Sequence, residues 1–141
     1  AAELRKQTGT DPEAVTDQLL ERVGLTAVAQ QRADSLSTGS ARLVELARAL
    51  ACGPRVLLLD EPASGLDEQE TDRFAEILVD LTGDGLGILL VEHDVPLVMR
   101  LCAQITVLNF GEVLASGSPI EVQKNPEVID AYLGQDPGAP G

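Results

Sequence analysis

The chain has 141 residues, and its 23 acidic residues outnumber its 10 lysines and arginines, which gives a formal net charge of −13 at pH 7. Only 2% of the residues are aromatic. Proteins that bind nucleic acid usually present a basic surface or aromatic side chains that stack on bases, so the composition argues against this class. The length suits one ordinary domain, and no stretch approaches the ~20 apolar residues of a membrane span. Cys52 and Cys102 have no spacing typical of metal ligands, and we expect both to be reduced and buried.

Two helices are predicted in the first third of the chain. Asp11 suits an N-cap, Pro12 the first turn and Gly24 the position after the last turn, so a helix is expected between them. A second helix is expected from Ser40 to Ala51. The side chains expected to be buried are Val15, Leu19 and Val23 in the first helix and Leu43, Leu46, Ala47 and Leu50 in the second.

The middle of the chain predicts two strands joined by a helix. The stretches RVLLLD (55–60) and GILLVEH (87–93) are apolar until their last residues, which is typical of parallel strands buried on both faces. A strand, a helix and a strand in this order predict a right-handed crossover in a parallel sheet. The helix between the strands is marked by Phe74, Ile77, Leu78 and Leu81.

The last third of the chain predicts a hairpin between short helices. A short helix is expected near 95–102, and Gly111 suggests a tight turn between two strands within 104–117. The capping-box sequence that starts at Ser118 predicts a further helix. A last helix should open at Asn125 and end at Gly134, and the tail after it is expected to be disordered.

Two adjacent acids end the first predicted strand. Asp60 and Glu61 follow four aliphatic residues, and in parallel α/β sheets ligands bind beyond the carboxyl ends of the strands. A carboxylate held there by a rigid strand is a suitable ligand for Mg2+. A second carboxylate can act as a base or orient water for attack on a γ-phosphate. The alternative is a pair of acids that simply ends a strand at the surface.

Two loops near this strand have features of a nucleotide site. The stretch LSTGS (36–40) opens the second helix, where free backbone N–H groups and the helix dipole attract anions. Ser37 adds a hydroxyl donor, and Gly39 permits the close approach of a phosphate. The stretch SGLD (64–67) follows the two acids. The alternatives are an ordinary N-cap for the first loop and, for the second, a turn in which Asp67 caps the next helix.

His93 is the only histidine, and it follows the second apolar strand. That strand is the expected neighbour of the strand that ends at Glu61, so the imidazole is expected where it can contact a γ-phosphate and the attacking water. A lone histidine with a purely structural role is the alternative.

In the order and spacing of these motifs, the sequence resembles the C-terminal part of an ABC-type ATP-binding cassette. The resemblance lies in the stretches LSTGSARLVELARAL, ACGPRVLLLDEPASGLD and GILLVEHD. The stretch VLNFGEVLASGSPIEVQKNPEVIDAYLG is similar to the C-terminal region of the ATPase subunits of branched-chain amino-acid importers. The resemblance implies an α/β fold, the parallel β-sheet core of a P-loop NTPase. The parts it implies are 1–52 in a partial helical subdomain with the signature helix, 53–117 in the catalytic core with the β-hairpin, 118–134 as C-terminal helices and 135–141 as a disordered tail.

The resemblance also implies roles for single residues. Leu36 to Ser40 match the signature motif, Val56 to Asp60 the Walker B strand and Ser64 to Asp67 the D-loop. The implied cofactors are ATP and Mg2+. The implied site consists of Glu61 and His93 as catalytic residues, Ser37, Thr38, Gly39, Ser40 and Asp67 as nucleotide contacts and Asp60 as the metal ligand.

Members of this family work as head-to-tail dimers, so residues 36–40 would act on the partner's nucleotide, whereas Asp60, Glu61 and His93 act on their own. The implied partners are a second cassette subunit, transmembrane permease subunits and, indirectly, an extracytoplasmic substrate-binding protein, with no nucleic acid. The implied activity is ATP hydrolysis coupled to import, carried out peripherally at the cytoplasmic face of a bacterial cell membrane.

The sequence departs from the family in two ways. Ser40 stands where the signature motif usually has glutamine. No G-x-x-x-x-G-K-[ST] loop occurs in the 141 residues. The phosphate cradle is therefore expected in an N-terminal segment outside this chain, which we interpret as a fragment that is nearly inactive as an ATPase by itself.

Two other classes compete with this interpretation. DNA-repair and chromosome-organising ATPases also carry a signature helix, but long coiled coils interrupt their cassettes, whereas here only residues 41–55 separate the signature from the Walker B strand. A non-catalytic interaction module is the other class. The presence of both Glu61 and His93 argues against it.

Overall fold

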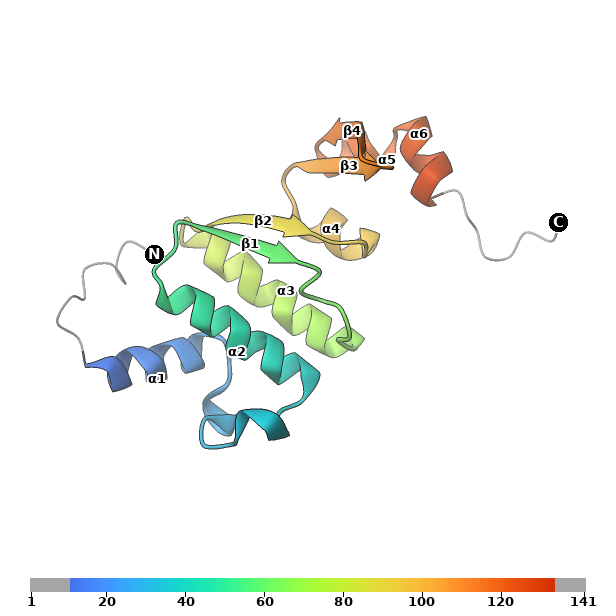
Figure 1. Cartoon of the computed structure of the whole chain (residues 1–141). Helices are drawn as coiled ribbons and strands as arrows, with labels where there is room; N and C mark the ends of the chain where they lie inside the picture. Colours follow the sequence, from blue (N-terminus) through green and yellow to red (C-terminus); the bar gives the residue numbers. More distant parts are fainter. Residues whose placement is uncertain (1–10, 134–141) are drawn as a thin grey trace. The chain divides into compact units, whose positions relative to one another are not determined.

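The computed structural model describes residues 11–133, which divide after His93 into two compact units. Figure 1 shows the path of the chain. The first unit contains α1 (Pro12–Arg22), α2 (Thr38–Ala51), β1 (Val56–Asp60), α3 (Glu68–Gly83) and β2 (Gly87–Val91), with short 3-10 turns at Thr26–Val28 and Ala33–Ser35. The second contains α4 (Val95–Leu101), β3 (Ile105–Asn109), β4 (Glu112–Gly117), α5 (Pro119–Gln123) and α6 (Pro126–Val128), followed by a π-helical turn at Ile129–Leu133.

The N-terminal helix forms as its capping residues predict. The Asp11 side chain accepts a hydrogen bond from the Glu13 N–H group and caps α1. Gly24, with a φ of 71°, follows the helix in the left-handed conformation that glycine adopts without steric cost. Leu19 and Val23 are buried and Val15 is partly buried, so the predicted apolar stripe is confirmed.

Helix α2 starts two residues earlier than its apolar pattern predicts. The Ser37 hydroxyl accepts a hydrogen bond from the Ser40 N–H group at 3.1 Å, and Thr38 and Gly39 therefore already belong to the first turn. The predicted apolar positions Leu43, Leu46, Ala47 and Leu50 are all buried. The N-terminal end of this 14-residue helix is thus built by the stretch that the sequence analysis singled out.

The two apolar strands pair in parallel, as predicted. Their register runs from Val56 opposite Gly87 to Asp60 opposite Val91. Helices α2 and α3 cover one face of this pair (Figure 1). The Leu57 side chain, which is 5% exposed, belongs to the resulting core. Burial of such apolar side chains is the main force that holds the layers together.

The prediction that both strands are buried on both faces is wrong for this chain. Their second face carries Val56, Leu58, Leu89 and Val91, whose exposed fractions range from 55% to 75%. Side chains alternate between the faces of a strand, and within the described part of the first unit the helices α2 and α3 cover one face only (Figure 1). A continuous apolar run is typical of a strand covered on both faces, but the run alone does not show whether a second layer of helices is present.

Helix α3 opens on a capping box. The Asp67 side chain accepts from the Glu70 N–H group at 2.8 Å, and the Glu70 side chain accepts from the Asp67 N–H group at 3.3 Å. The alternative interpretation of the 64–67 stretch, in which Asp67 caps this helix, is therefore confirmed. The predicted apolar positions Phe74, Ile77, Leu78 and Leu81 are all buried.

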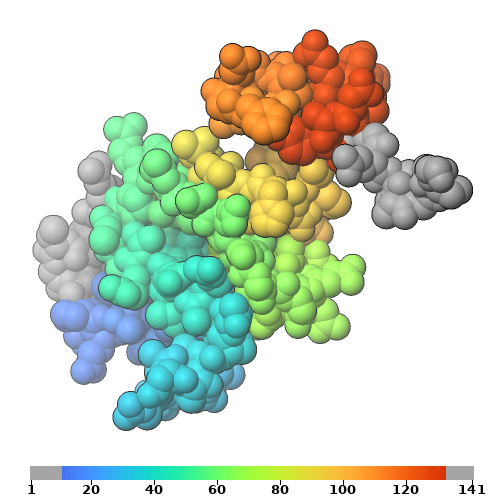
Figure 2. Space-filling model, turned by 45° about the vertical axis from the view of Figure 1, so that its right-hand side comes forward, coloured from blue at the N-terminus to red at the C-terminus, as the bar shows by residue number. Residues whose placement is uncertain are grey.

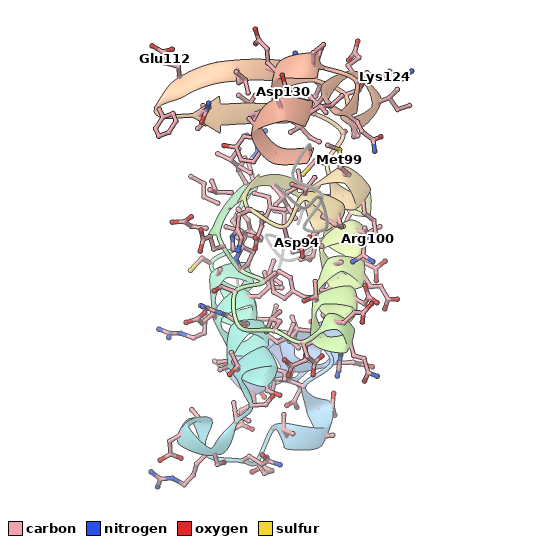
Figure 3. All side chains as sticks on the ribbon, turned by 90° about the vertical axis from the view of Figure 1, so that its right-hand side faces the viewer. Asp94, Met99, Arg100, Glu112, Lys124 and Asp130 are labelled. Atoms are coloured by element: carbon pink, nitrogen blue, oxygen red, sulfur yellow. The ribbon has the colours of Figure 1, made fainter. Side chains whose placement is uncertain are left out.

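The second unit is built on the predicted hairpin. Strands β3 and β4 pair in antiparallel fashion around a turn in which Phe110 and Gly111 have φ values of 48° and 85°. Glu112 in β4 and Lys124 after α5 are exposed on this unit (Figure 3). The core of the unit consists of Ile105, Val122 and Val128, with Val98, Met99, Cys102, Val107, Leu114 and Ala115 packed against them.

The predicted C-terminal helices form at their capping residues. The Ser118 and Glu121 side chains make a complete capping box at α5. Asn125 caps α6 by accepting from the Glu127 and Val128 N–H groups. The expected helix end at Gly134 and the expected disorder of the tail lie outside the described residues.

The two cysteines differ in their surroundings. Cys52 follows the last turn of α2 and is exposed, so its predicted burial is wrong. Cys102 packs partly against the core of the second unit, and this burial raises the pKa of its thiol. None of the helices in residues 11–133 is both long enough and apolar enough to cross a membrane.

Candidate functional site

The carboxyl end of β1 presents two carboxylates. Asp60 is the last residue of the strand, and Glu61 remains tied to β2 because its N–H group donates to the Val91 carbonyl oxygen at 2.8 Å. Glu61 has a φ of 44°, in the left-handed region that non-glycine residues seldom adopt. The chain therefore turns sharply at Glu61, and both carboxylates are exposed.

The imidazole of His93 lies next to Glu61. Its Nδ1 atom is 3.6 Å from Oε1 of Glu61, and both side chains are accessible, with exposed fractions of 73% and 54%. The two residues follow neighbouring strands, as the sequence predicts. The structure thus brings together Asp60, Glu61 and His93 at one edge of the sheet.

Glu92 is a third acidic residue at this edge, and it is not among the site residues predicted from the sequence. Its side chain is only 1% exposed, in contrast to those of its neighbours. Oε1 accepts a hydrogen bond from the Ala63 N–H group at 2.9 Å, and Oε2 accepts one from the His93 N–H group at 3.2 Å. The available signal was an acid placed directly after an apolar strand, where a carboxylate is often hydrogen-bonded.

The predicted nucleotide contacts lie at the N-terminal end of α2. Ser37 and Thr38 are exposed, Ser40 is half-buried and Gly39 is buried. Figure 2 shows this part of the chain (cyan) at the molecular surface. A shallow pocket beside it is lined by Gly39, Ser40, Leu43, Leu66, Glu70, Arg73 and Phe74.

Glu70 explains why Gly39 is buried. A Cβ atom added at Gly39 would clash with the carboxylate of Glu70, so the Glu70 side chain occupies the space that any larger residue would need. The Ser37 hydroxyl lies 3.4 Å from the same oxygen, to which it donates. Glu70 therefore contacts the start of α2 while it completes the capping box with Asp67.

The stretches 36–40 and 64–67 are adjacent in the fold. Besides the bridge through Glu70, an added Cβ atom at Gly65 would lie 3.6 Å from the Thr38 methyl group. Within residues 11–133, no hydrogen bond or ion pair joins the 36–40 stretch to Asp60, Glu61 or His93. The predicted site residues thus form two groups, one at the sheet edge and one at the start of α2.

Asp60, the predicted metal ligand, suits Mg2+, but the described residues do not provide a complete set of metal ligands around it. In the described part of the chain, no group of three or more His, Cys, Asp or Glu residues could hold a metal ion. The exposed carboxylate of Asp60 is the hard oxygen ligand that Mg2+ prefers. Mg2+ is commonly bound through one or two carboxylates together with substrate phosphates and water, and Asp60 suits this kind of site.

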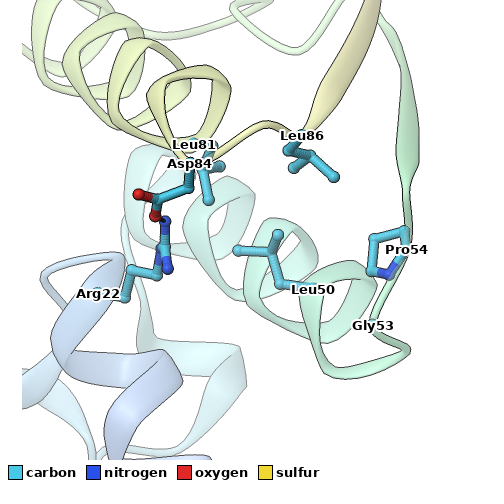
Figure 4. Close-up of a pocket in the computed structure, with 7 residues that line it drawn as sticks. All are labelled: Arg22, Leu50, Gly53, Pro54, Leu81, Asp84 and Leu86. Carbon is cyan, nitrogen blue, oxygen red and sulfur yellow. Dashed lines mark hydrogen bonds and ion pairs between the residues drawn. The ribbon is translucent and has the colours of Figure 1, made fainter. Parts of the chain in front are cut away.

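A separate pocket lies between α1, α2 and the end of α3 (Figure 4). It is lined by Arg22, Leu50, Gly53, Pro54, Leu81, Asp84 and Leu86, and Arg22 and Asp84 form an ion pair across it. None of the residues predicted for the functional site lines this pocket. The ion pair ties α1 to the end of α3.

Comparison with known proteins agrees with the resemblance seen in the sequence. The family model described as "ABC transporter" matches residues 2–64, and the model described as "Branched-chain amino acid ATP-binding cassette transporter" matches residues 112–137. The chain is 44% identical over 117 residues to the high-affinity branched-chain amino acid transport ATP-binding protein LivG of Salmonella typhimurium, covering 82% of this chain and 46% of LivG.

Two further matches extend the comparison. The lipopolysaccharide export system ATP-binding protein LptB of Acidithiobacillus ferridurans is 40% identical over 118 residues, which covers 84% of this chain and 49% of LptB. The crystal structure of an ATP-binding cassette of an ABC transporter in its ADP conformation superposes with a TM-score of 0.79 at 26% identity, covering 92% of this chain and 54% of that one. The chain thus spans about half the length of the curated relatives it matches.

The comparisons of sequence and of structure agree with the order of the motifs. The paired strands, the helix capped by Ser37 and the hairpin all lie where the resemblance predicts them. In sequence and in fold, the chain therefore resembles the C-terminal part of the ATP-binding cassettes of ABC transporters.

Proposed function

We propose that the chain is the C-terminal portion of an ATP-hydrolysing subunit of an ABC importer. The observation that carries this proposal is the pair formed by Glu61 and His93, 3.6 Å apart at the carboxyl ends of two parallel strands, with Asp60 beside them. This edge of an α/β sheet is where ligands bind. A carboxylate and an imidazole that both remain accessible can act on a bound phosphate.

In this proposal each residue at the sheet edge has one task. Asp60 would hold Mg2+, which, when bound with ATP, neutralises the charge that develops on the phosphates. Glu61 would orient the attacking water and accept its proton. His93 would donate a hydrogen bond towards the γ-phosphate while its Nδ1 atom faces Glu61.

The start of α2 would act on a second nucleotide, held by another cassette subunit. Its free backbone N–H groups and the Ser37 hydroxyl are suitable donors for phosphate oxygens, and Thr38, Gly39 and Ser40 lie in the same turn. Asp67 belongs to the adjacent loop. The separation of this group from Glu61 and His93 supports an arrangement in which two subunits meet head to tail.

The phosphate loop itself would come from sequence outside the 141 residues. No G-x-x-x-x-G-K-[ST] motif occurs in the chain, and the relatives that it matches are about twice as long as the matched part. The chain alone should therefore be nearly inactive as an ATPase. The complete protein would act with permease subunits at the cytoplasmic face of a bacterial membrane, and indirectly with an extracytoplasmic binding protein.

Branched-chain amino acids are the proposed transported substrates. The support is the match of residues 112–137 to the branched-chain amino acid cassette model and the 44% identity to LivG. The 40% identity to LptB supports lipopolysaccharide export as the second candidate. The two differ in cargo and direction, so a transport assay separates them.

The test is uptake of radiolabelled leucine by cells that lack the gene encoding this protein. We expect uptake to fall on deletion, to return with the intact gene and to remain low with the Glu61→Gln form. Normal leucine uptake by the deletion strain, together with a defect in its outer surface lipids, would favour the export function instead.

A further inference from the structure

Glu92 has the least accessible side chain of the charged groups at the sheet edge. It is 1% exposed, whereas His93 and Glu61 beside it are 73% and 54% exposed. Burial of a carboxylate is costly unless hydrogen bonds replace those of water. The His93 imidazole lies beside it, with its Nδ1 atom 3.7 Å from Oε2.

Backbone N–H groups supply the compensation, and they come from two different segments. Oε1 accepts from Ala63, in the loop that follows β1, and Oε2 accepts from His93, at the end of β2. Hydrogen bonds to an ionised acceptor are among the stronger ones in proteins. Glu92 therefore fastens the loop after one strand to the end of the next.

The fastened loop begins at a strained residue. Glu61 has a φ of 44°, a conformation that costs energy for a residue with a Cβ atom and persists only when its surroundings hold it. The loop has its own turns, with hydrogen bonds from the Ser64 N–H group to the Glu61 carbonyl and from Leu66 to Ala63. The bond from Ala63 to Glu92 fixes these turns to the sheet.

We propose that Glu92 is a positioning residue that sets the placement of Glu61 relative to His93. It faces the backbone on both sides, so it acts through the loop and the imidazole rather than on a substrate. The catalytic consequence of this role rests on the proposed function, whereas the structural part does not. If Glu92 served stability alone, its replacement would lower the folding stability without changing the placement of Glu61 relative to His93.

The first experiment measures backbone amides in the 141-residue chain by NMR. In a Glu92→Ala form, we expect hydrogen exchange of the Ala63 and His93 amides to speed up by about tenfold or more, the factor that loss of a charged hydrogen bond implies. In a Glu92→Gln form the amide oxygen can still accept from Ala63, so only the His93 amide should change. Glu76→Gln, at an exposed position of α3, is the matched control and should leave both amides unchanged.

The second experiment measures ATP turnover by the protein extended through its natural upstream sequence. We expect Glu92→Ala to lower kcat by about tenfold or more, with KM for ATP little changed, because a misplaced catalytic group affects the chemical step. Glu92→Gln should recover part of the rate. Unchanged amides, or an unchanged kcat in a protein that depends on Glu61, would overturn the positioning role.

The two experiments fail independently. If Glu92→Ala does not fold, the Gln form decides, through the exchange of its His93 amide and its kcat. If the extended protein does not depend on Glu61 at all, the proposed function fails. The NMR experiment still shows whether Glu92 holds the loop.

Discussion

The Nδ1 atom of His93 lies 3.6 Å from Oε1 of Glu61, although the two residues belong to different strand ends. The parallel register that places Asp60 opposite Val91 brings the two strand ends to the same edge. Parallel pairing is therefore sufficient to assemble residues that are far apart in the sequence. Both side chains remain largely exposed, as the proposed nucleotide site requires.

Leu57 and Leu58 are adjacent in β1 and should differ sharply in their effect on stability. Leu57 is 5% exposed and Leu58 is 75% exposed. We expect Leu57→Ala to lower the free energy of unfolding by about 2–5 kcal/mol, because it leaves a cavity in the core. Leu58→Ala should change it by less than about 0.5 kcal/mol, as for most surface substitutions. Urea unfolding followed by circular dichroism measures both; equal losses would show that both faces of the strand are covered.

Gly39 and Glu70 should be coupled. Alanine at Gly39 normally favours a helix by up to about 1 kcal/mol, but here its Cβ atom would displace the Glu70 carboxylate from Ser37 and Asp67. We expect Gly39→Ala to be more favourable in a Glu70→Ala background than in the wild-type chain. The difference between the backgrounds, obtained from four urea midpoints, should be about 1 kcal/mol. If the effects of the two substitutions on the free energy of unfolding simply add, the contact between Gly39 and Glu70 is contradicted.

The capping box at α5 predicts a dependence of stability on pH. Hydrogen bonds from the Ser118 hydroxyl and then from its backbone N–H group lower the pKa of Glu121. A folded-state pKa below the unfolded one adds stability above the ordinary glutamate pKa of about 4.3, and this stability is lost as the pH falls through the lowered value. The difference in stability between the wild-type chain and Glu121→Gln should therefore shrink between pH 7 and pH 3.

Tyrosine fluorescence measures this stability difference. Tyr132 is the only tyrosine and the chain contains no tryptophan, so the signal reports the unfolding of the second unit. Glu112→Gln, at an exposed position of β4, is the matched control and should show no such change with pH. A pH-independent difference for Glu121→Gln would mean that the cap contributes equally with a neutral side chain.

The two thiols should react at different rates. Cys52 is exposed after α2, whereas Cys102 is partly buried and burial raises the pKa of its thiol. The thiolate is the reactive form, so we expect a thiol reagent at pH 8 to modify Cys52 about tenfold faster or more. Mass spectrometry of peptides after short exposure locates the label. Preferential labelling of Cys102 would contradict the packing of the second unit.

The sequence alone predicted the elements well where the signal is local. Capping residues such as Asp11, Asp67 and Ser118 fixed the helix starts, and the apolar run before Asp60 predicted a strand. The placement of His93 near Glu61 followed from the general behaviour of parallel sheets. The catalytic and binding roles of these residues stay predictions.

The features that the sequence did not predict depend on tertiary contacts. The exposure of Leu58 depends on which layers cover the sheet, and a run of aliphatic residues does not contain that information. Glu70 resembles an ordinary surface acid in the sequence, and only its position after an apolar strand distinguishes Glu92. Their contacts to Ala63 and Gly39 arise because segments distant along the chain meet in the fold.

The most direct test of the central claim is Mg2+-dependent ATP hydrolysis by three proteins. These are the 141-residue chain, the same chain extended through its natural upstream sequence, and the extended chain with Glu61→Gln. We predict turnover by the extended chain only, and loss of that turnover by about a hundredfold or more in the Gln form, since general acid–base catalysis contributes on this scale. Hydrolysis by the 141-residue chain alone, or full activity of the Glu61→Gln form, would contradict the assignment of the sheet edge as one half of a nucleotide site.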